Sequence, residues 1–157
     1  MSDIKEVSPG KISSRRIYTG RVISLDVDEV RFPNGTTGEL EMIRHSGASA
    51  IVPILEMPGQ EKQVLLIRQY RYAAGGFLYE VPAGRLEPGE APETCAHREL
   101  KEETGYSAAT LTHLTTIFTT PGFTDEKIHL FVAHGLTSGE SALESDEILE
   151  LHPTPFS

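Results

Sequence analysis

The sequence predicts an α+β domain in which a mixed β-sheet packs against a helix. Short runs rich in β-branched and aromatic residues are separated by turn signals such as Pro33-Asn34-Gly35 and Pro58-Gly59. A single well-marked helix, expected over residues 92–104, interrupts these runs near the middle of the chain. The 157 residues are enough to bury one such core.

The expected elements follow these turn signals along the chain. Residues 1–14 are polar and are predicted to form a flexible arm. Residues 15–45 are predicted to be N-terminal strands, with a hairpin made by 21–32 and 39–44. The remainder, 46–157, is predicted to be a catalytic domain, with strands at 48–55, 63–70, 77–81, 111–118, 127–133 and 148–151.

The helix has recognisable ends. Pro92 suits the first turn, where its missing N–H is no loss, and Glu93 lies near the positive end of the helix dipole. Gly105 can take the left-handed conformation that ends a helix.

Three glutamates crowd one side of this helix. Glu99 is three residues before Glu102 and four before Glu103, so the three side chains lie on adjoining parts of one face. Like charges at this spacing repel each other, whereas a hard divalent cation takes carboxylate oxygens as ligands. The pattern therefore indicates a metal site, and the alternative is a solvated, salt-bridged helix face.

Composition narrows the class of protein. A net charge of −9 argues against a nucleic-acid partner, although a metal ion and a few arginines can still hold a small polyanion. No stretch approaches the length of a membrane span, and no signal-peptide pattern is present. Cys95 is the only cysteine, so an intramolecular disulfide is excluded and a cytoplasmic location is expected. Cys95 itself is interpreted as a packing residue rather than a nucleophile.

The spacing of the acidic helix resembles the signature of a known family. Read in order, Gly84, Glu90, Arg98-Glu99-Leu100, Glu102-Glu103 and Gly105 match the Nudix box, with Tyr106 where a bulky aliphatic residue is usual. The resemblance implies the Nudix fold, an α/β/α sandwich. That fold usually has a second helix near the C-terminus, and residues 152–157 carry no such pattern, so this helix is expected to be absent or truncated.

Features outside the box resemble the ADP-ribose pyrophosphatase branch of the family. These are Gln69-Tyr70-Arg71, the Glu80-Val81-Pro82-Ala83-Gly84 entry to the box, and Pro121 within the segment 121–126. The branch implies hydrolysis of ADP-ribose to AMP and ribose 5-phosphate. The alternatives are another nucleoside diphosphate sugar such as GDP-mannose, or a sensor module that binds ADP-ribose without cleaving it.

The resemblance also implies roles for individual residues. Mg²⁺, with Mn²⁺ as the alternative ion, would be held by the carboxylates of Glu99, Glu102 and Glu103 and by the carbonyl of Ala83. Arg98 would orient these carboxylates, and Glu90 would brace the loop against the helix.

The general base is expected in the acidic segment beyond the box, among Glu144, Asp146 and Glu147, with Glu144 preferred. The expected substrate ligands are Arg71 for phosphate or ribose, Glu126 for ribose hydroxyls and Arg44 for stacking on adenine. For Arg71 and Glu126 the alternatives are a surface ion pair and a solvated loop acid. The N-terminal strands are expected to form a homodimer, as they do in this branch.

Overall fold

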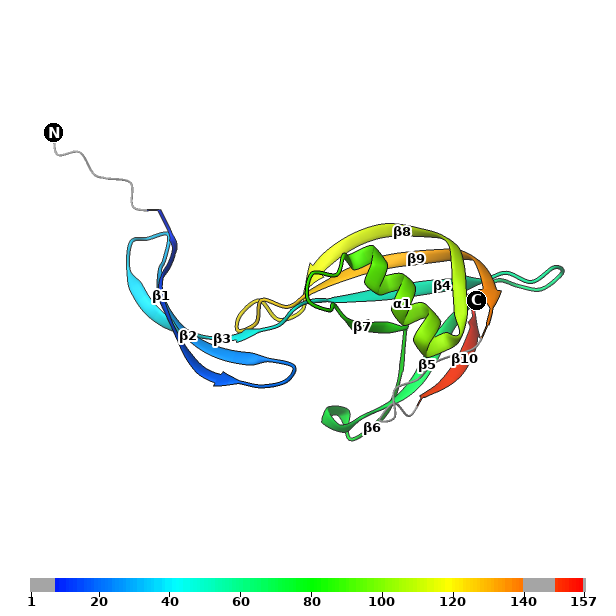
Figure 1. The fold of residues 1–157 in the computed structure, drawn as a ribbon, viewed down its shortest axis with the longest axis horizontal. Helices are drawn as coiled ribbons and strands as arrows, with labels where there is room; N and C mark the ends of the chain where they lie inside the picture. Colours follow the sequence, from blue (N-terminus) through cyan, green and yellow to red (C-terminus); the bar gives the residue numbers. More distant parts are fainter. Residues whose placement is uncertain (1–7, 140–148, 157) are drawn as a thin grey trace. The chain divides into compact units, whose positions relative to one another are not determined.

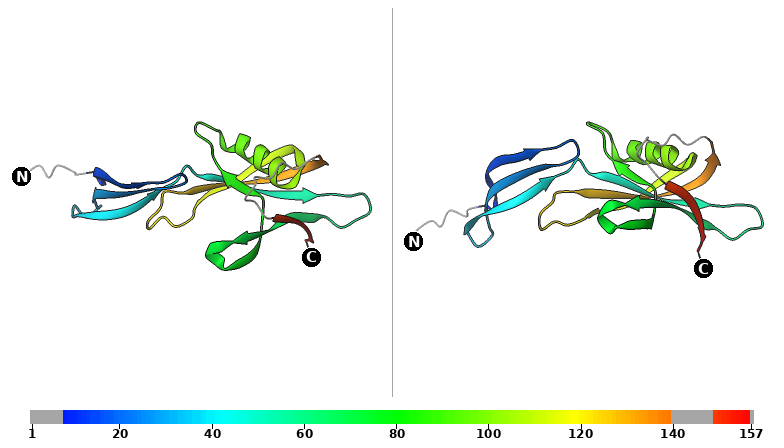
Figure 2. Two further views of the ribbon diagram at one scale, coloured as in Figure 1. Left: turned by 60° about the horizontal axis from the view of Figure 1, so that its bottom comes forward. Right: turned by 90° about the horizontal axis from the view of Figure 1, so that it is seen from below.

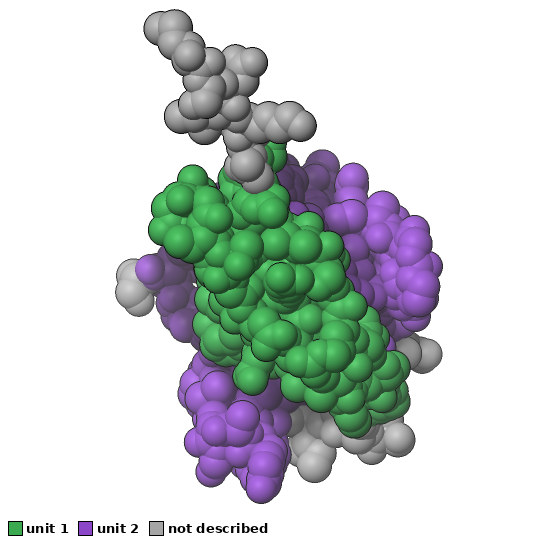
Figure 3. Space-filling view, turned by 90° about the vertical axis from the view of Figure 1, so that its left-hand side faces the viewer, with its two compact units in different colours: residues 1–45, 118–126 green, residues 46–117, 127–157 purple. Residues whose placement is uncertain are grey.

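The structure, a computed structural model, describes residues 8–139 and 149–156 (Figure 1). The chain divides into two compact units, which Figure 3 colours separately. Unit 1 comprises Met1–His45 and Phe118–Glu126, and unit 2 comprises Ser46–Ile117 and Lys127–Ser157. Residues 118–126 cluster with the N-terminal strands, whereas the sequence analysis assigned them to the catalytic domain that it began at residue 46.

Unit 1 is built on a three-stranded antiparallel sheet in the order β1 (Gly10–Thr19), β2 (Ser24–Arg31), β3 (Thr37–Arg44). The predicted hairpin is confirmed, and Gly35 turns it with a φ of 84°. The predicted arm is wrong for residues 10–14, which belong to β1. Every residue of β1 is exposed, so the strand carries none of the apolar alternation by which a sequence reveals a half-buried strand.

Unit 2 contains a mixed seven-stranded sheet. Its main path runs β10 (Leu149–Pro155), β5 (Gln63–Arg71), β4 (Ala48–Leu55), β9 (Lys127–Ser138), β8 (Tyr106–Phe118). β6 (Gly76–Glu80) pairs with β5, β7 (Ala83–Arg85) pairs with β4, and the 3₁₀ turn η1 (Tyr72–Ala74) links β5 to β6. β4 and β9 are parallel, whereas β4 pairs antiparallel with β5 and β7.

Prolines occur in strands at one end of the sheet path and at its centre, at positions where a missing N–H donor is tolerated. β10 contains Pro153 and Pro155, which an edge strand tolerates because one side of it needs no N–H donors. In the centre, β4 pairs with β7 up to Ala50 and with β5 from Ile54. Pro53, which has no N–H, lies in the interval between these two partners.

The helix α1 (Pro92–Thr104) lies against one face of this sheet, on β4, β7 and β9 (Figure 2). Its apolar side joins the core of unit 2, which comprises Ile51, Ala96, Leu100, Phe131 and Ala133. The buried stripe recurs every four residues as Cys95-Ala96, Glu99-Leu100 and Glu103-Thr104. Two of the box glutamates therefore lie on the buried side of the helix and not on its solvated face.

The predicted helix ends are both present. Pro92 occupies the first turn, and Gly105 ends the helix with a φ of 76° while its N–H donates to the carbonyl of Lys101 (2.8 Å). The predicted α+β class with a mixed sheet is confirmed. Within residues 8–139 and 149–156 α1 is the only α-helix, so the second helical layer of the sandwich is not among them. No helix in these residues is long and apolar enough to cross a membrane.

Candidate functional site

Arg98 gathers the box into one connected unit. Its Nε and Nη2 donate to the two carboxylate oxygens of Glu90, both at 3.0 Å. Its Nη1 donates to Glu99 (2.6 Å) and to Glu102 (3.0 Å), and Nη2 also reaches the carbonyl of Arg85 (3.1 Å). One guanidinium therefore contacts three carboxylates and the loop before the helix.

Glu103 joins the helix to β7. Its Oε2 accepts a hydrogen bond from the N–H of Ala83 (2.9 Å), and only 3% of the residue is exposed. The predicted metal ligands Glu103 and Ala83 are thus brought into contact, although they are 20 residues apart in the sequence.

Gly84 allows β7 to approach the helix closely. A Cβ at this position would lie 1.9 Å from the carboxylate carbon of Glu99, so no side chain fits there. Cys95 donates from Sγ to the carbonyl of Gly84 (3.5 Å). Burial raises the pKa of the Cys95 thiol to about 11, so it stays protonated at neutral pH, as expected for a packing residue.

The charges of the box stabilise each other. The Arg98 guanidinium lowers the pKa of Glu90 from 4.5 to about 2, against the opposing effect of burial and with help from the N–H of Glu87. Glu90 in turn raises the pKa of Arg98 above its ordinary value. Both groups are therefore charged at neutral pH, and Glu90 acts as the brace between loop and helix.

The chemistry of this donor set fits a divalent cation. Glu99, Glu102 and Glu103 supply hard oxygen atoms, and two of the three are buried on the β7 side of the helix. Among the described residues, no three His, Cys, Asp or Glu side chains are arranged tightly enough to hold a metal ion. Instead, the Arg98 guanidinium supplies the positive charge between Glu99 and Glu102. The predicted base candidates Glu144, Asp146 and Glu147 lie outside the described residues.

Arg71 and Glu80 connect two of the branch motifs. They come from the paired strands β5 and β6, and the guanidinium forms a two-pronged contact with the carboxylate at 2.7 to 3.2 Å. The side chain of Arg71 is 43% exposed, so it combines this fixed orientation with access from solvent.

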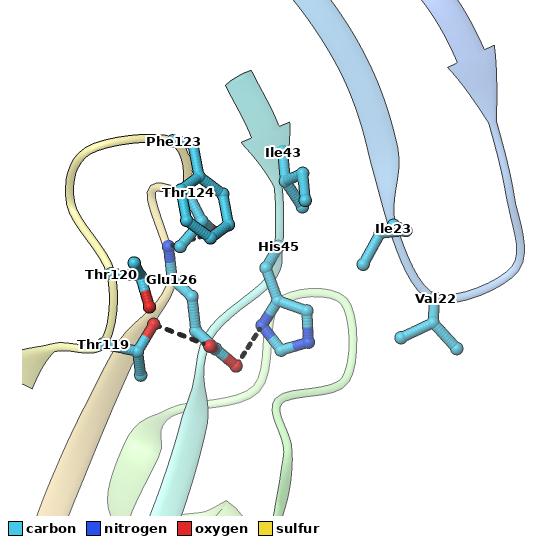
Figure 4. A pocket seen from close by; sticks show the side chains of 9 residues that line it. All are labelled: Val22, Ile23, Ile43, His45, Thr119, Thr120, Phe123, Thr124 and Glu126. Carbon is cyan, nitrogen blue, oxygen red and sulfur yellow. Dashed lines mark hydrogen bonds and ion pairs between the residues drawn. The ribbon is translucent and has the colours of Figure 1, made fainter. Parts of the chain in front are cut away.

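Glu126 lines a pocket of 330 Å³ within unit 1 (Figure 4). Its carboxylate contacts Nδ1 of His45 (3.2 Å) and accepts a hydrogen bond from the hydroxyl of Thr119 (2.8 Å). The rest of the lining comes from the apolar Val22, Ile23, Ile43 and Phe123 and from Thr120 and Thr124. The sequence analysis missed His45, because the contact joins the end of β3 to a loop far along the chain.

Arg44 is held by acidic residues. Its Nε donates to Asp26 (3.0 Å), its Nη1 to Asp125 (3.1 Å) and its Nη2 to Asp28. Ser14 and Arg44 lower the pKa of Asp28, Arg16 and Arg44 lower that of Asp26, and the carboxylates raise that of Arg44. Sequence reasoning missed these aspartates. Their alternation in β2 is a signal, since it places both charges on one face of the strand.

The fold and the box together define a class of enzyme. Residues 45–156 match the NUDIX domain, and the chain belongs to this family. The predicted enzyme class, a Nudix hydrolase, is thereby confirmed. Pyrophosphatases of this family use a divalent metal ion, in keeping with the carboxylate donors of α1.

Relatives extend over most of the chain. A methanol dehydrogenase activator from Bacillus methanolicus is 44% identical, with 89% of this chain and 75% of the relative aligned. An ADP-ribose pyrophosphatase from Bacillus subtilis (strain 168) is 40% identical, with 92% of this chain and 76% of the relative aligned. A crystal structure of an ADP compounds hydrolase superposes with a TM-score of 0.76 at 26% identity, covering 95% of this chain and 79% of that one.

The Glu90–Arg98 pair predicts acid-dependent stability. A carboxyl whose pKa is lowered on folding stabilises the fold above its ordinary value of 4.5, and this contribution is lost as the pH falls from there towards 2. Glu90→Gln should therefore unfold at lower urea concentration at neutral pH and lose less stability than the wild type on acidification. Urea unfolding at neutral pH, pH 4.5 and pH 3 measures this difference. Glu61→Gln, in the exposed turn after β4, is the control and should follow the wild type; a parallel pH profile for Glu90→Gln would refute the assignment.

Proposed function

We propose that this enzyme hydrolyses ADP-ribose to AMP and ribose 5-phosphate, with Mg²⁺ or Mn²⁺ as the required ion. The observation that carries the proposal is the box assembled on Arg98, because burying and aligning several like charges has no reward in folding alone. The identity to an ADP-ribose pyrophosphatase over 92% of the chain supports the substrate.

The contacts of the box residues support the roles that the proposal gives them. Glu99, Glu102, Glu103 and the carbonyl of Ala83 would hold the divalent ion. Bound there, such an ion neutralises the pyrophosphate and favours ionisation of a water molecule. Arg98 keeps the carboxylates Glu99 and Glu102 at fixed separations from one guanidinium, so that the ligand set is organised before substrate arrives.

Water attack on one phosphorus breaks the bond to the bridging oxygen, which leaves with the other phosphate. The water loses one proton to a general base, and Glu144 is our candidate for that base. Arg71, which Glu80 orients, would bind a phosphate or ribose oxygen. Glu126 would accept hydrogen bonds from ribose hydroxyls, since an ionised carboxylate is an acceptor only.

Measuring AMP release from ADP-ribose with Mg²⁺ or Mn²⁺, beside GDP-mannose, NADH and diadenosine polyphosphates, tests this function. We expect a preference for ADP-ribose that a chelator abolishes. Glu103→Gln should reduce turnover to background, whereas Glu93→Gln, an exposed glutamate in the first turn of the same helix, should keep it. If the enzyme prefers GDP-mannose, the proposed substrate is wrong but the hydrolase function stands. Tight binding of ADP-ribose without turnover would identify the protein as a sensor.

The choice of general base has its own test. Glu144→Gln should lower kcat by about 10²- to 10⁴-fold, the usual contribution of a positioned base, with little change in KM. Asp146→Asn and Glu147→Gln are matched controls in the same segment and should retain most of the wild-type kcat. If Glu147→Gln is inactive and Glu144→Gln is not, the base is Glu147.

We also propose that unit 1 forms a homodimer through the open face of its sheet. Leu25 and Val27 alternate with the buried aspartates of β2. They line a groove of 670 Å³ together with the apolar Ile17 and Leu40 and the charged Arg15, Glu39 and Glu41. Ile17 is 48% exposed, although such a side chain normally avoids solvent. Exposed apolar side chains grouped beside charges of both signs support this groove as an interaction surface.

Sedimentation should therefore show a dimer for the wild type and a monomer for Ile17→Glu, because a charge within the groove cannot be desolvated cheaply. Met57→Glu, an exposed apolar residue in the turn after β4, is the control and should remain dimeric. A monomeric wild type at micromolar concentration would refute this interface.

A further inference from the structure

The loop at residues 119–126 is attached to β3 by several independent contacts inside unit 1. Ile43 and Thr124 form a parallel bridge, in which the N–H of Ile43 donates to the carbonyl of Phe123 (2.7 Å). The N–H of Asp125 donates back to the carbonyl of Ile43 (3.2 Å). The backbone thus brings the loop alongside the end of the strand, at the edge of the pocket that contains Glu126.

Asp125 adds a side-chain bond on each of its carboxylate oxygens. Oδ1 accepts from the N–H of His45 (3.0 Å), and Oδ2 accepts from Nη1 of Arg44 (3.1 Å). The donors belong to consecutive residues, Arg44 at the end of β3 and His45 just after it. An isolated, partly exposed ion pair contributes little, but a carboxylate bonded at both oxygens to one rigid strand fixes direction as well as distance.

Arg44 is itself immobilised from the other side. Its partners Asp26 and Asp28 expose only 9% and 7% of their side chains, and the sheet β1–β2–β3 fixes both. Arg44 therefore connects the loop to the sheet through fixed ion pairs. This is a different role from the stacking on adenine that the sequence analysis expected. We call the set Asp26, Asp28, Arg44 and Asp125 the Arg44 network.

Glu126 directly follows the residue that the network holds. Its carboxylate also meets the side chain of His45, whose backbone N–H is bonded to Asp125. Two adjacent acids of the loop thus contact Arg44, the last residue of β3, and His45, which follows it. A shift of the loop along the strand would move the Glu126 carboxylate within the pocket.

We infer that Asp125 is a positioning residue for substrate binding, which locks the loop 119–126 to β3 through Arg44 and His45 and thereby sets where the Glu126 carboxylate meets the substrate. This inference rests on the proposed function, because it takes Glu126 to be a substrate ligand. Asp125 itself touches no substrate and acts only through its neighbour.

A double-mutant cycle on Asp125 and Glu126 tests this role. The Kd for ADP-ribose is measured by calorimetry without divalent metal, so that binding is read without hydrolysis, and KM and kcat are measured with Mg²⁺. Asp125→Asn keeps the size of the side chain but presents an amide N–H₂ to Arg44 or to the N–H of His45. We expect it to raise Kd and KM by about 5- to 10-fold, less than the direct loss of a charged hydrogen bond because the effect is transmitted through Glu126, with kcat within about 2-fold of the wild type.

The effect should vanish once Glu126 is removed. Asp125→Asn/Glu126→Gln should bind no more weakly than Glu126→Gln alone, because residues acting through one another are not additive. Arg16→Gln is the matched control: Arg16 also pairs with Asp26 but not with Asp125, so it can lower the thermal midpoint while leaving Kd unchanged.

Additive effects of Asp125→Asn and Glu126→Gln, or an unchanged Kd in Asp125→Asn, would overturn the inference. So would an equal rise in Kd for Arg16→Gln, which would mean that general destabilisation is the cause. An enzyme that binds ADP-ribose without hydrolysing it would refute the proposed function and still allow the cycle to decide the role of Asp125. A wild type that does not bind ADP-ribose would overturn both.

Discussion

The contact on which the box depends is the one between Arg98 and its three carboxylates. Glu90 holds the guanidinium from the loop side, and Glu99 and Glu102 hold it from the helix, so the residues before and after Pro92 form one rigid body. Without this cation, carboxylates at helical spacing would repel each other, and Glu99, on the buried side of α1, would lose its ion pair. The ion pair therefore makes it possible to concentrate negative charge where a divalent cation can use it.

The helix α1 contributes to both the hydrophobic core and the candidate site, which explains why apolar residues and glutamates alternate on its buried side. Leu100 and Ala96 pack in the core with Ile51 and Phe131. The neighbouring Glu99 and Glu103 lie on the side of the helix that faces β7. Gly84 makes this possible, because any side chain there would collide with Glu99. Catalytic geometry is thus supported by core packing, and a rigid element carries the predicted metal ligands.

The two units organise acidic residues in similar ways. In unit 2 an arginine on the helix gathers glutamates, and in unit 1 Arg44 gathers aspartates from a strand and a loop. In each case a planar cation with several donors fixes carboxylates that come from different segments. An acidic protein can therefore present ordered anionic and cationic groups to a nucleotide substrate. The net charge of −9 describes the whole surface and not the individual site.

The sequence alone determined the family, the box, the helix over 92–104 with its proline and glycine ends, and most strands of unit 2. These follow from local spacing and turn chemistry, which the chain displays directly. Residues 10–14 of the exposed strand β1 were missed because they lack alternation, and the grouping of residues 118–126 with unit 1 depends on a bridge to Ile43. Only the tertiary structure decided that Arg44 is bonded to Asp26, Asp28 and Asp125 and that His45 meets Glu126. The pairings of Arg44 with Asp125 and of His45 with Glu126 join residues about 80 positions apart, and no local pattern encodes them because chain folding, not spacing, brings the partners together.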